Sequence, residues 1–180
     1  MTGPVWQQGL MDVPADFLPD FARTCIDEGV DVFVAHGPHA LRGIEVYHGK
    51  PIFYSLGELV FQIETIQRLP AIDYQHFGLG HDATPADYFD ARSGKDTRSF
   101  AADPLYWRSV AVKCILAGRE LQKIELYPLD LGQGLPRTQR GRPFVAGEKV
   151  AEAVIDRIQT VSKPYGTEIK REGELWVIRP

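Results

Sequence analysis

The order of apolar and polar positions near the start of the chain predicts a helix followed by a strand. Phe17, Phe21 and Cys25 recur at four-residue steps, the spacing of one helix face, and Asp16 is placed to cap that helix. The run 31–35 that follows is nearly continuously apolar, which is typical of a strand buried on both faces. The pattern therefore predicts a helix that leads into a covered sheet.

Further along the chain, pairs of strand-like segments flank turn residues and predict three hairpins. Gly and Pro between two apolar runs favour a chain reversal. The segments are 44–47 with 52–56 across His48-Gly49-Lys50-Pro51, 107–116 with 121–126 around Gly118, and 168–178 turning at Glu172-Gly173.

Two other regions complete the pattern. Between about residues 62 and 103 the periodicity fades, and we expect a long excursion with short helical pieces, of the kind that serves as a lid in some enzymes. After a loop rich in Gly, Pro and Arg at 132–143, one helix face is expected, ending before Pro164. Its apolar positions are Val150, Val154, Ile158 and Val161.

Length and composition indicate a single domain, and the predicted helices and strands give it a mixed α/β (α+β) class. The 180 residues show no internal repeat or composition shift, so residues 1–180 are expected to form one domain. The net charge is −4 with both signs interspersed, which gives no indication of nucleic-acid binding. No apolar run approaches the roughly 20 residues that span a bilayer, and the first residues lack a signal-peptide pattern.

Candidate chemistry is concentrated in residues 35–43, called the His loop below. His36 and His39 directly follow the expected buried strand, and ligands of open α/β sheets gather at such strand ends. Gly37 and Pro38 between them favour a stiff turn. Neutral imidazole is a common ligand of zinc, manganese and iron, so the pair is a candidate metal site. By spacing alone, surface or hydrogen-bonded histidines remain the commoner outcome.

Two charged residues, one in this loop and one beyond it, are candidates for catalysis. Arg42 has the planar fork that clamps phosphate or carboxylate, although a solvated Arg is common after a turn. Glu58 follows a predicted strand and suits either an acid–base role, a supporting contact to a metal ligand, or a cap of the next segment. The sequence leaves these alternatives open.

The residues around the His loop resemble a known family. Residues 29–39, with Arg42-Gly43-Ile44-Glu45-Val46-Tyr47, Gly49-Lys50-Pro51-Ile52-Phe53-Tyr54-Ser55-Leu56-Gly57 and Val60-Phe61, are similar to the signature of the CapA proteins of poly-γ-glutamate and capsule synthesis. The resemblance spans most of residues 14–62, and Tyr165-Gly166-Thr167 resembles the family's C-terminal pattern more loosely.

The resemblance implies the C-terminal half of a calcineurin-like metallophosphoesterase, a β-sandwich flanked by helices with metal ions at strand ends. By position, His36 and His39 correspond to the family's late histidine motif, and Arg42 and Tyr54 become candidates for substrate binding. Divalent Mn, Zn or Fe would be the cofactor. Glu58 stands where many relatives carry Asn, which is a departure from the pattern.

The family's earlier metal-binding motifs have no counterpart before residue 14, so we expect an incomplete metal site and an inactive chain when it is alone. A missing N-terminal part would also leave an open sheet edge or an apolar face, which favours self-association. Family members suggest a location at the bacterial cell surface or membrane.

Three functions are therefore carried forward. The first is a role in capsule or poly-γ-glutamate synthesis or export, with a metal-dependent hydrolase-like site in the complete protein. The second is a metallophosphoesterase or γ-glutamyl hydrolase of another pathway. The third is a non-catalytic module that binds an acidic polymer. The expected partner is an acidic polymer or a phosphoester substrate.

Overall fold

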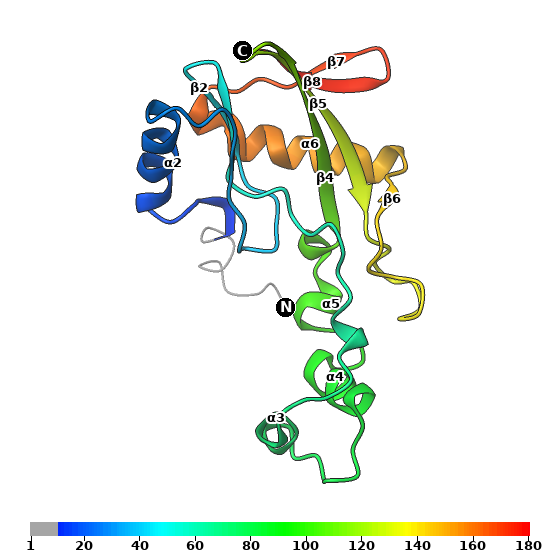
Figure 1. Ribbon diagram of the computed structural model, residues 1–180. Helices are drawn as coiled ribbons and strands as arrows, with labels where there is room; N and C mark the ends of the chain where they lie inside the picture. The colour runs from blue at the N-terminus through cyan, green and yellow to red at the C-terminus, as the bar shows by residue number, and fades with distance from the viewer. Residues whose placement is uncertain (1–10) are drawn as a thin grey trace.

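A computed structural model describes residues 11–180, in which two β-sheets share a long helix (Figure 1). The predicted mixed α/β class is confirmed, and the arrangement is compatible with part of a metallophosphoesterase-like sandwich. None of the helices within these residues has the length and apolar character needed to cross a membrane.

The first sheet carries the segments around the His loop. Its strand order is β1 (Phe33–Val34), β3 (Lys50–Phe53) and β2 (Ile44–Tyr47), with β1 parallel and β2 antiparallel to β3. The first predicted hairpin is confirmed, and its tight turn uses positive φ at His48 and Gly49. Helix α2 (Phe17–Asp27) precedes β1 and packs beside this sheet through Ala22 and Ile26.

Two details of the predicted N-terminal unit are wrong. Asp16 has helical backbone angles, and its carboxylate makes no capping hydrogen bond to α2. The strand β1 has two residues, and Val34 is 60% exposed. Within the described residues β1 pairs with β3 alone, so one side of the strand is not covered. A continuous apolar run predicts that a strand is buried, but it does not show which neighbouring segments cover the strand.

The second sheet is antiparallel and longer. Strands β4 (Arg108–Ala117) and β5 (Glu120–Asp130) form its main ribbon, which β8 (Leu175–Ile178) and β7 (Lys170–Glu172) extend on one side. Strand β6 (Phe144–Val145) pairs with the far end of β5. Both predicted hairpins in this region are confirmed.

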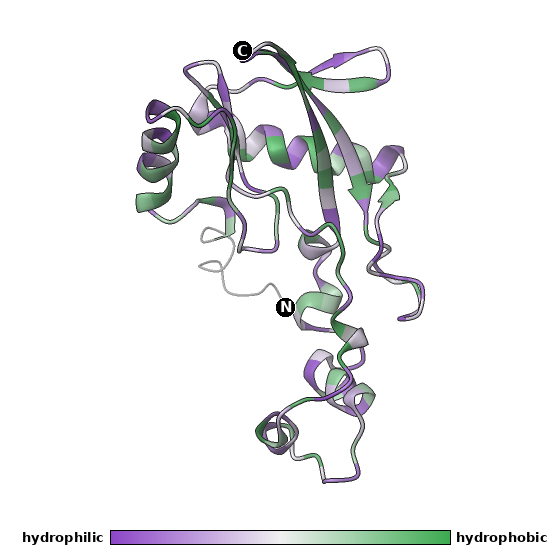
Figure 2. Cartoon of the chain, in the orientation of Figure 1, coloured by the Kyte–Doolittle hydropathy of each residue, from purple (hydrophilic) through white to green (hydrophobic). Residues whose placement is uncertain are grey.

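Helix α6 (Glu148–Ser162) joins the two sheets into one apolar core. Hydrophobic and hydrophilic residues alternate along it, as Figure 2 shows, and the predicted face is confirmed because Val154 and Ile158 are fully buried. The Ser162 hydroxyl accepts a hydrogen bond from the Ile44 amide at 2.9 Å. The core cluster consists of Leu41, Ile44, Phe53, Val110, Leu121, Ile124, Leu126, Val154, Ile155, Ile158 and Ile178.

The excursion at 62–103 extends away from both sheets (Figure 1). Its short helical pieces are confirmed, and the longest begins with a capping box between Thr84 and Asp87. The pieces are η1 (Ile63–Thr65), α3 (Ala71–His76), α4 (Pro85–Ser93) and α5 (Ser99–Ala102), followed by η2 (Pro104–Tyr106) and η3 (Lys163–Tyr165) elsewhere in the chain.

Candidate functional site

The His loop leaves β1 through a tightly bent backbone. The Ala35 amide donates to the Phe53 carbonyl at 2.8 Å, which continues the sheet contact past the end of β1. Gly37 then has φ 140°, a value that residues with a side chain rarely adopt, and His39 has φ 60°. A left-handed non-glycine residue costs roughly 1 kcal/mol, so the surrounding structure must hold His39 in place.

Both predicted metal-ligand side chains reach the surface on this loop. The ring centroids of His36 and His39 lie 6.0 Å apart with their planes at 73°. The side chain of His39 is 50% exposed, so solvent reaches it. The loop therefore presents two imidazoles side by side to the same region of solvent.

Glu58 is brought against His39 by the segment that follows β3. A backbone bridge between Leu41 and Leu56 ties this segment to the end of the His loop. The Glu58 carboxylate contacts Nδ1 of His39, and its side chain is only 15% exposed. Of the roles that the sequence left open for Glu58, this position fits a residue that orients His39.

The donor set fits part of a metal centre. A carboxylate on Nδ1 of a histidine fixes the ring and leaves Nε2 as the free donor atom, an arrangement common at metal-binding histidines. Among residues 11–180, no three His, Cys, Asp or Glu side chains come together in a way that could hold a metal ion. Two imidazoles and one supporting carboxylate are what this part of the chain supplies.

The excursion contributes an aromatic residue to the same place. The Phe100 ring of α5 lies with its centroid 6.4 Å from that of His39, at an interplanar angle of 73°. Phe100 also packs against Tyr106 and Phe61, whose ring centroids are 4.6 and 6.2 Å away. Phe100 thus forms an apolar wall beside the imidazoles, contributed by a segment about 60 residues along the chain.

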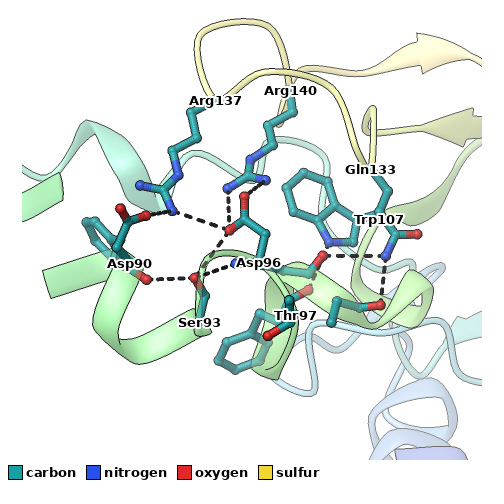
Figure 3. Close-up of polar contacts among 12 residues, drawn as sticks. Asp90, Ser93, Asp96, Thr97, Trp107, Gln133, Arg137 and Arg140 are labelled. Atoms are coloured by element: carbon teal, nitrogen blue, oxygen red, sulfur yellow. Dashed lines mark hydrogen bonds and ion pairs between the residues drawn. The ribbon is translucent and has the colours of Figure 1, made fainter. Parts of the chain in front are cut away.

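A charged cluster fixes the excursion to the loop 132–143 (Figure 3). Arg140 and Arg137 reach from that loop to Asp96, at N–O distances of 2.8 and 3.3 Å, and Arg137 also contacts Asp90 at 2.7 Å. The Arg140 guanidinium holds the pKa of the Asp96 carboxyl below its usual value. The Trp107 indole donates to the Phe100 carbonyl at 2.8 Å, which holds α5 itself.

Arg42 lies near the end of the His loop. Its Nε donates to the Met11 carbonyl at 3.2 Å, and its backbone amide donates to the Ser55 carbonyl at 3.0 Å. Partial burial and, to a smaller extent, the nearby guanidinium of Arg157 lower the pKa of Arg42. The side chain is half-buried, and the substrate-binding role predicted for it stays a prediction.

Tyr54 lies in the core of the first sheet. It is fully buried, its hydroxyl donates to the Glu45 carboxylate at 2.7 Å, and its ring stacks on Tyr165 with centroids 4.8 Å apart. Burial, together with this carboxylate, raises the pKa of Tyr54 far above its usual value. Arg23 of α2 completes the group by pairing with Glu45 at 2.9 Å. In this position Tyr54 supports the sheet that carries the His loop.

Three residues of this region, Glu45, Asp96 and Phe100, carry no signal in the sequence pattern. Glu45 lies in a strand, where a charged residue is expected to face solvent. Its burial depends on the hydrogen bond from Tyr54, nine residues away, and the sequence pattern does not reveal that partner. Phe100 and Asp96 lie in a stretch without periodicity. The capping box at Thr84 and Asp87 was the readable signal for the start of α4.

Comparison with known proteins relates the first third of the chain to one family. Residues 6–63 match the family described as bacterial capsule synthesis protein PGA_cap. A Sinorhizobium fredii protein, y4sH, is 34% identical over 177 residues, covering 92% of this chain and 37% of that protein. The PGA biosynthesis protein CapA of Bacillus subtilis is 42% identical over 91 residues, covering 48% of this chain and 24% of its own length.

The capsule biosynthesis protein CapA of Bacillus anthracis is also similar, with 38% identity over 56 residues that cover 31% of this chain and 14% of that protein. The chain spans little more than a third of the length of the rhizobial relative. The family match covers α2, β1, the His loop and the hairpin of the first sheet. Over residues 6–63 the chain is thus similar to bacterial capsule-synthesis proteins, and proteins named CapA are among its relatives.

Proposed function

We propose that the chain is part of a CapA-type protein that acts in capsule or poly-γ-glutamate synthesis or export at the bacterial cell surface. Two relatives whose names refer to PGA or capsule biosynthesis support the pathway. The observation that supports a chemical role is the contact of Glu58 with Nδ1 of His39, beside the ring of His36. The proposed site is metal-dependent and hydrolase-like.

In this proposal, His36 and His39 each donate an imidazole nitrogen to a divalent ion, Mn, Zn or Fe. When bound, such an ion polarises a phosphoryl or carbonyl oxygen and lowers the pKa of a bound water. Glu58 orients His39 and makes its ring a better donor. Phe100 limits the access of water to one side of the pair.

Two imidazoles do not complete such a site. Catalytic metal centres use three or more protein ligands, and within residues 11–180 the described side chains supply no third one. We therefore propose that further ligands come from outside these residues and that the chain alone holds metal weakly. The substrate class of the assembled site would be an acidic polymer or a phosphoester.

The test measures metal binding to the chain. Equilibrium dialysis against buffered Mn²⁺ or Zn²⁺, followed by elemental mass spectrometry, gives the affinity. We expect His36→Ala/His39→Ala to abolish specific binding, and Glu58→Gln to weaken it about 10- to 100-fold, as for other residues that orient metal ligands.

His48→Ala is the matched control, because His48 also contacts a carboxylate, Asp27, at 3.2 Å and belongs to the turn of the first hairpin. Its metal binding should equal that of the wild type. A wild-type chain that binds no metal, or a double variant that binds as well as the wild type, would contradict the proposed ligands.

A further inference from the structure

A small cleft of about 20 Å³ lies between the excursion and the loop 132–143, with Phe100 in its lining. Three arginines line it, Arg92, Arg137 and Arg140, together with Asp96 and the Phe100 ring. This volume holds about one water-sized group. The cleft therefore has room for the oxygen of a single acidic group, and not for a whole ligand.

Among the described residues, one of the three arginines of the cleft lacks a carboxylate partner. Arg137 and Arg140 are neutralised by Asp90 and Asp96. The guanidinium carbon of Arg92 lies 5.6 Å from the Phe100 ring centroid, and Arg92 makes no ion pair with any residue of the described part of the chain. One positive charge is therefore left in a half-buried place, where an anion would gain most from it.

The backbone around the cleft is strained. Lys95, Asp96 and Ser99 have positive φ values of 55°, 65° and 62°. His39, whose ring also lies against Phe100, has φ 60°. Left-handed non-glycine residues persist where the surrounding contacts hold them, and they concentrate at ligand-binding sites. Four such residues thus flank one aromatic ring that touches both the His loop and Arg92.

We propose that this cleft binds one anionic oxygen group, a carboxylate or a phosphate, with Arg92 as the residue that contacts it. That the bound anion is part of the substrate processed at the His loop rests on the proposed function. Arg92 would then determine specificity for acidic substrates, because its guanidinium can donate a charge-assisted hydrogen bond to such an oxygen.

The charged cluster has a defined part in this proposal. Asp96 holds Arg137 and Arg140, and through them the loop 132–143, at the rim of the cleft. Phe100 lines the cleft, and both His39 and Arg92 lie against its ring. A polymer with repeated acidic groups could place one group at Arg92 while a neighbouring bond lies at the His loop.

The test compares Arg92→Gln and Arg92→Lys with the wild-type chain by isothermal titration calorimetry in metal-free, low-salt buffer. The probes are a short γ-linked glutamate oligomer, inorganic phosphate, and the same oligomer with its side carboxylates amidated. We expect Arg92→Gln to weaken binding of the anionic probes about tenfold, as for loss of a charge-assisted hydrogen bond. Arg92→Lys should keep part of the affinity, and the amidated oligomer should not bind.

Arg171→Gln is the matched control. Arg171 also lies over an aromatic ring, 5.3 Å from the centroid of Trp176, but it belongs to β7, far from the excursion (Figure 1). Its binding should stay within twofold of the wild type. Circular dichroism checks that each variant is folded.

The outcomes distinguish a carboxylate from a phosphate ligand, and they distinguish failure of the Arg92 proposal from failure of the proposed metal site. Binding of the oligomer that phosphate does not displace assigns a carboxylate, and full displacement by phosphate assigns a phosphate group. Unchanged binding in Arg92→Gln, equal loss in Arg171→Gln, or no wild-type binding of either anion would overturn the proposal. Because the buffer holds no metal, a failed metal test of the His loop leaves this measurement unaffected.

Discussion

At the scale of single residues, Arg140 carries a charge that is almost completely removed from water. Its side chain is 3% exposed, with the Asp96 carboxylate at 2.8 Å and the Trp107 ring centroid 5.2 Å from its guanidinium carbon. A buried guanidinium is stable only while such partners remain, because an unpaired buried charge is costly. The Arg140–Asp96 pair is therefore sensitive to anything that neutralises the carboxylate.

Replacing Asp96 by Asn should lower the free energy of unfolding by about 1–3 kcal/mol at pH 7, because a charge-assisted hydrogen bond to Arg140 is lost. The pKa of Asp96 is below its ordinary 3.8 in the folded chain, so its stabilising effect is complete above pH 3.8 and is lost as the pH falls through the folded value. Urea unfolding from pH 7 to pH 2 measures both effects.

Glu172→Gln is the control for this series, since Glu172 pairs with Arg179 at 2.8 Å on the surface and Arg179 is 56% exposed. An exposed pair contributes little, so we expect almost no change. Equal unfolding curves for Asp96→Asn and the wild type at pH 7 would show that Arg140 does not depend on this carboxylate.

The position of a residue in the His loop could be predicted where its neighbours in sequence determine the backbone. The histidines and the bend at Gly37 follow from neighbouring residues. The positions of Glu58 and Tyr54 depend on how the first sheet closes, because the contact with His39 spans 19 residues and the hydrogen bond from Tyr54 to Glu45 spans nine. The sequence offered three roles for Glu58. It also made Tyr54 a candidate for substrate binding, which stays a prediction for a side chain that is fully buried.

At the scale of elements, the excursion begins where its backbone meets the loop 132–143. The Phe61 amide donates to the Gly141 carbonyl at 2.7 Å, and Gly141 has φ 83°. A Cβ atom at this position would lie 2.0 Å from the Phe61 carbonyl oxygen. Glycine is therefore required here both for the backbone angle and for the close approach of two chain segments.

We expect Gly141→Ala to lower the free energy of unfolding by about 3 kcal/mol or more, since strain and a backbone clash add. Gly134→Ala is the matched control, because Gly134 lies in the same loop with φ 81° and a Cβ there would meet nothing within 4 Å. It should show only the conformational cost, about 1 kcal/mol. Thermal unfolding of both variants gives the comparison, and equal losses would contradict the clash.

Element prediction succeeded where a turn signal lies between two patterned strands, as in the three hairpins, and where a long helix has one apolar face, as in α6. It failed for β1 because an apolar run predicts burial by some neighbour, and in residues 11–180 that strand has a pairing partner on one side only. The arrangement of the excursion could not be predicted, because its attachment depends on ion pairs 41 to 47 residues apart.

At the scale of the whole molecule, exposed apolar side chains gather on and beside α2 and β1. Phe17 and Phe21 of α2 are 69% and 55% exposed, and Val34 of β1 is 60% exposed. Val13, Val30 and Val32 add to this surface. Large exposed apolar areas favour association, and a strand with a free edge provides backbone groups for it. The predicted tendency to self-associate remains a prediction that this surface supports.

Light scattering after size-exclusion chromatography should detect dimers or larger species of the wild type at tens of micromolar, and Phe17→Lys/Val34→Lys should shift the population toward monomer. Val145→Lys is the control, because Val145 is 90% exposed on β6, apart from this surface. A wild type that is monomeric throughout, or an equal shift in the control, would contradict self-association through α2 and β1.

The attachment of the excursion by ion pairs and a few aromatic rings has a consequence for the order in which the molecule forms. The core shared by both sheets and α6 is apolar and continuous, whereas the excursion is held mainly by Asp96, Arg137, Arg140 and Phe100. Segments held by fewer apolar contacts open at lower free energy, as separate cooperative units. The histidines would then be in place before their aromatic neighbour docks, and brief undocking would expose them on one more side without loss of the core.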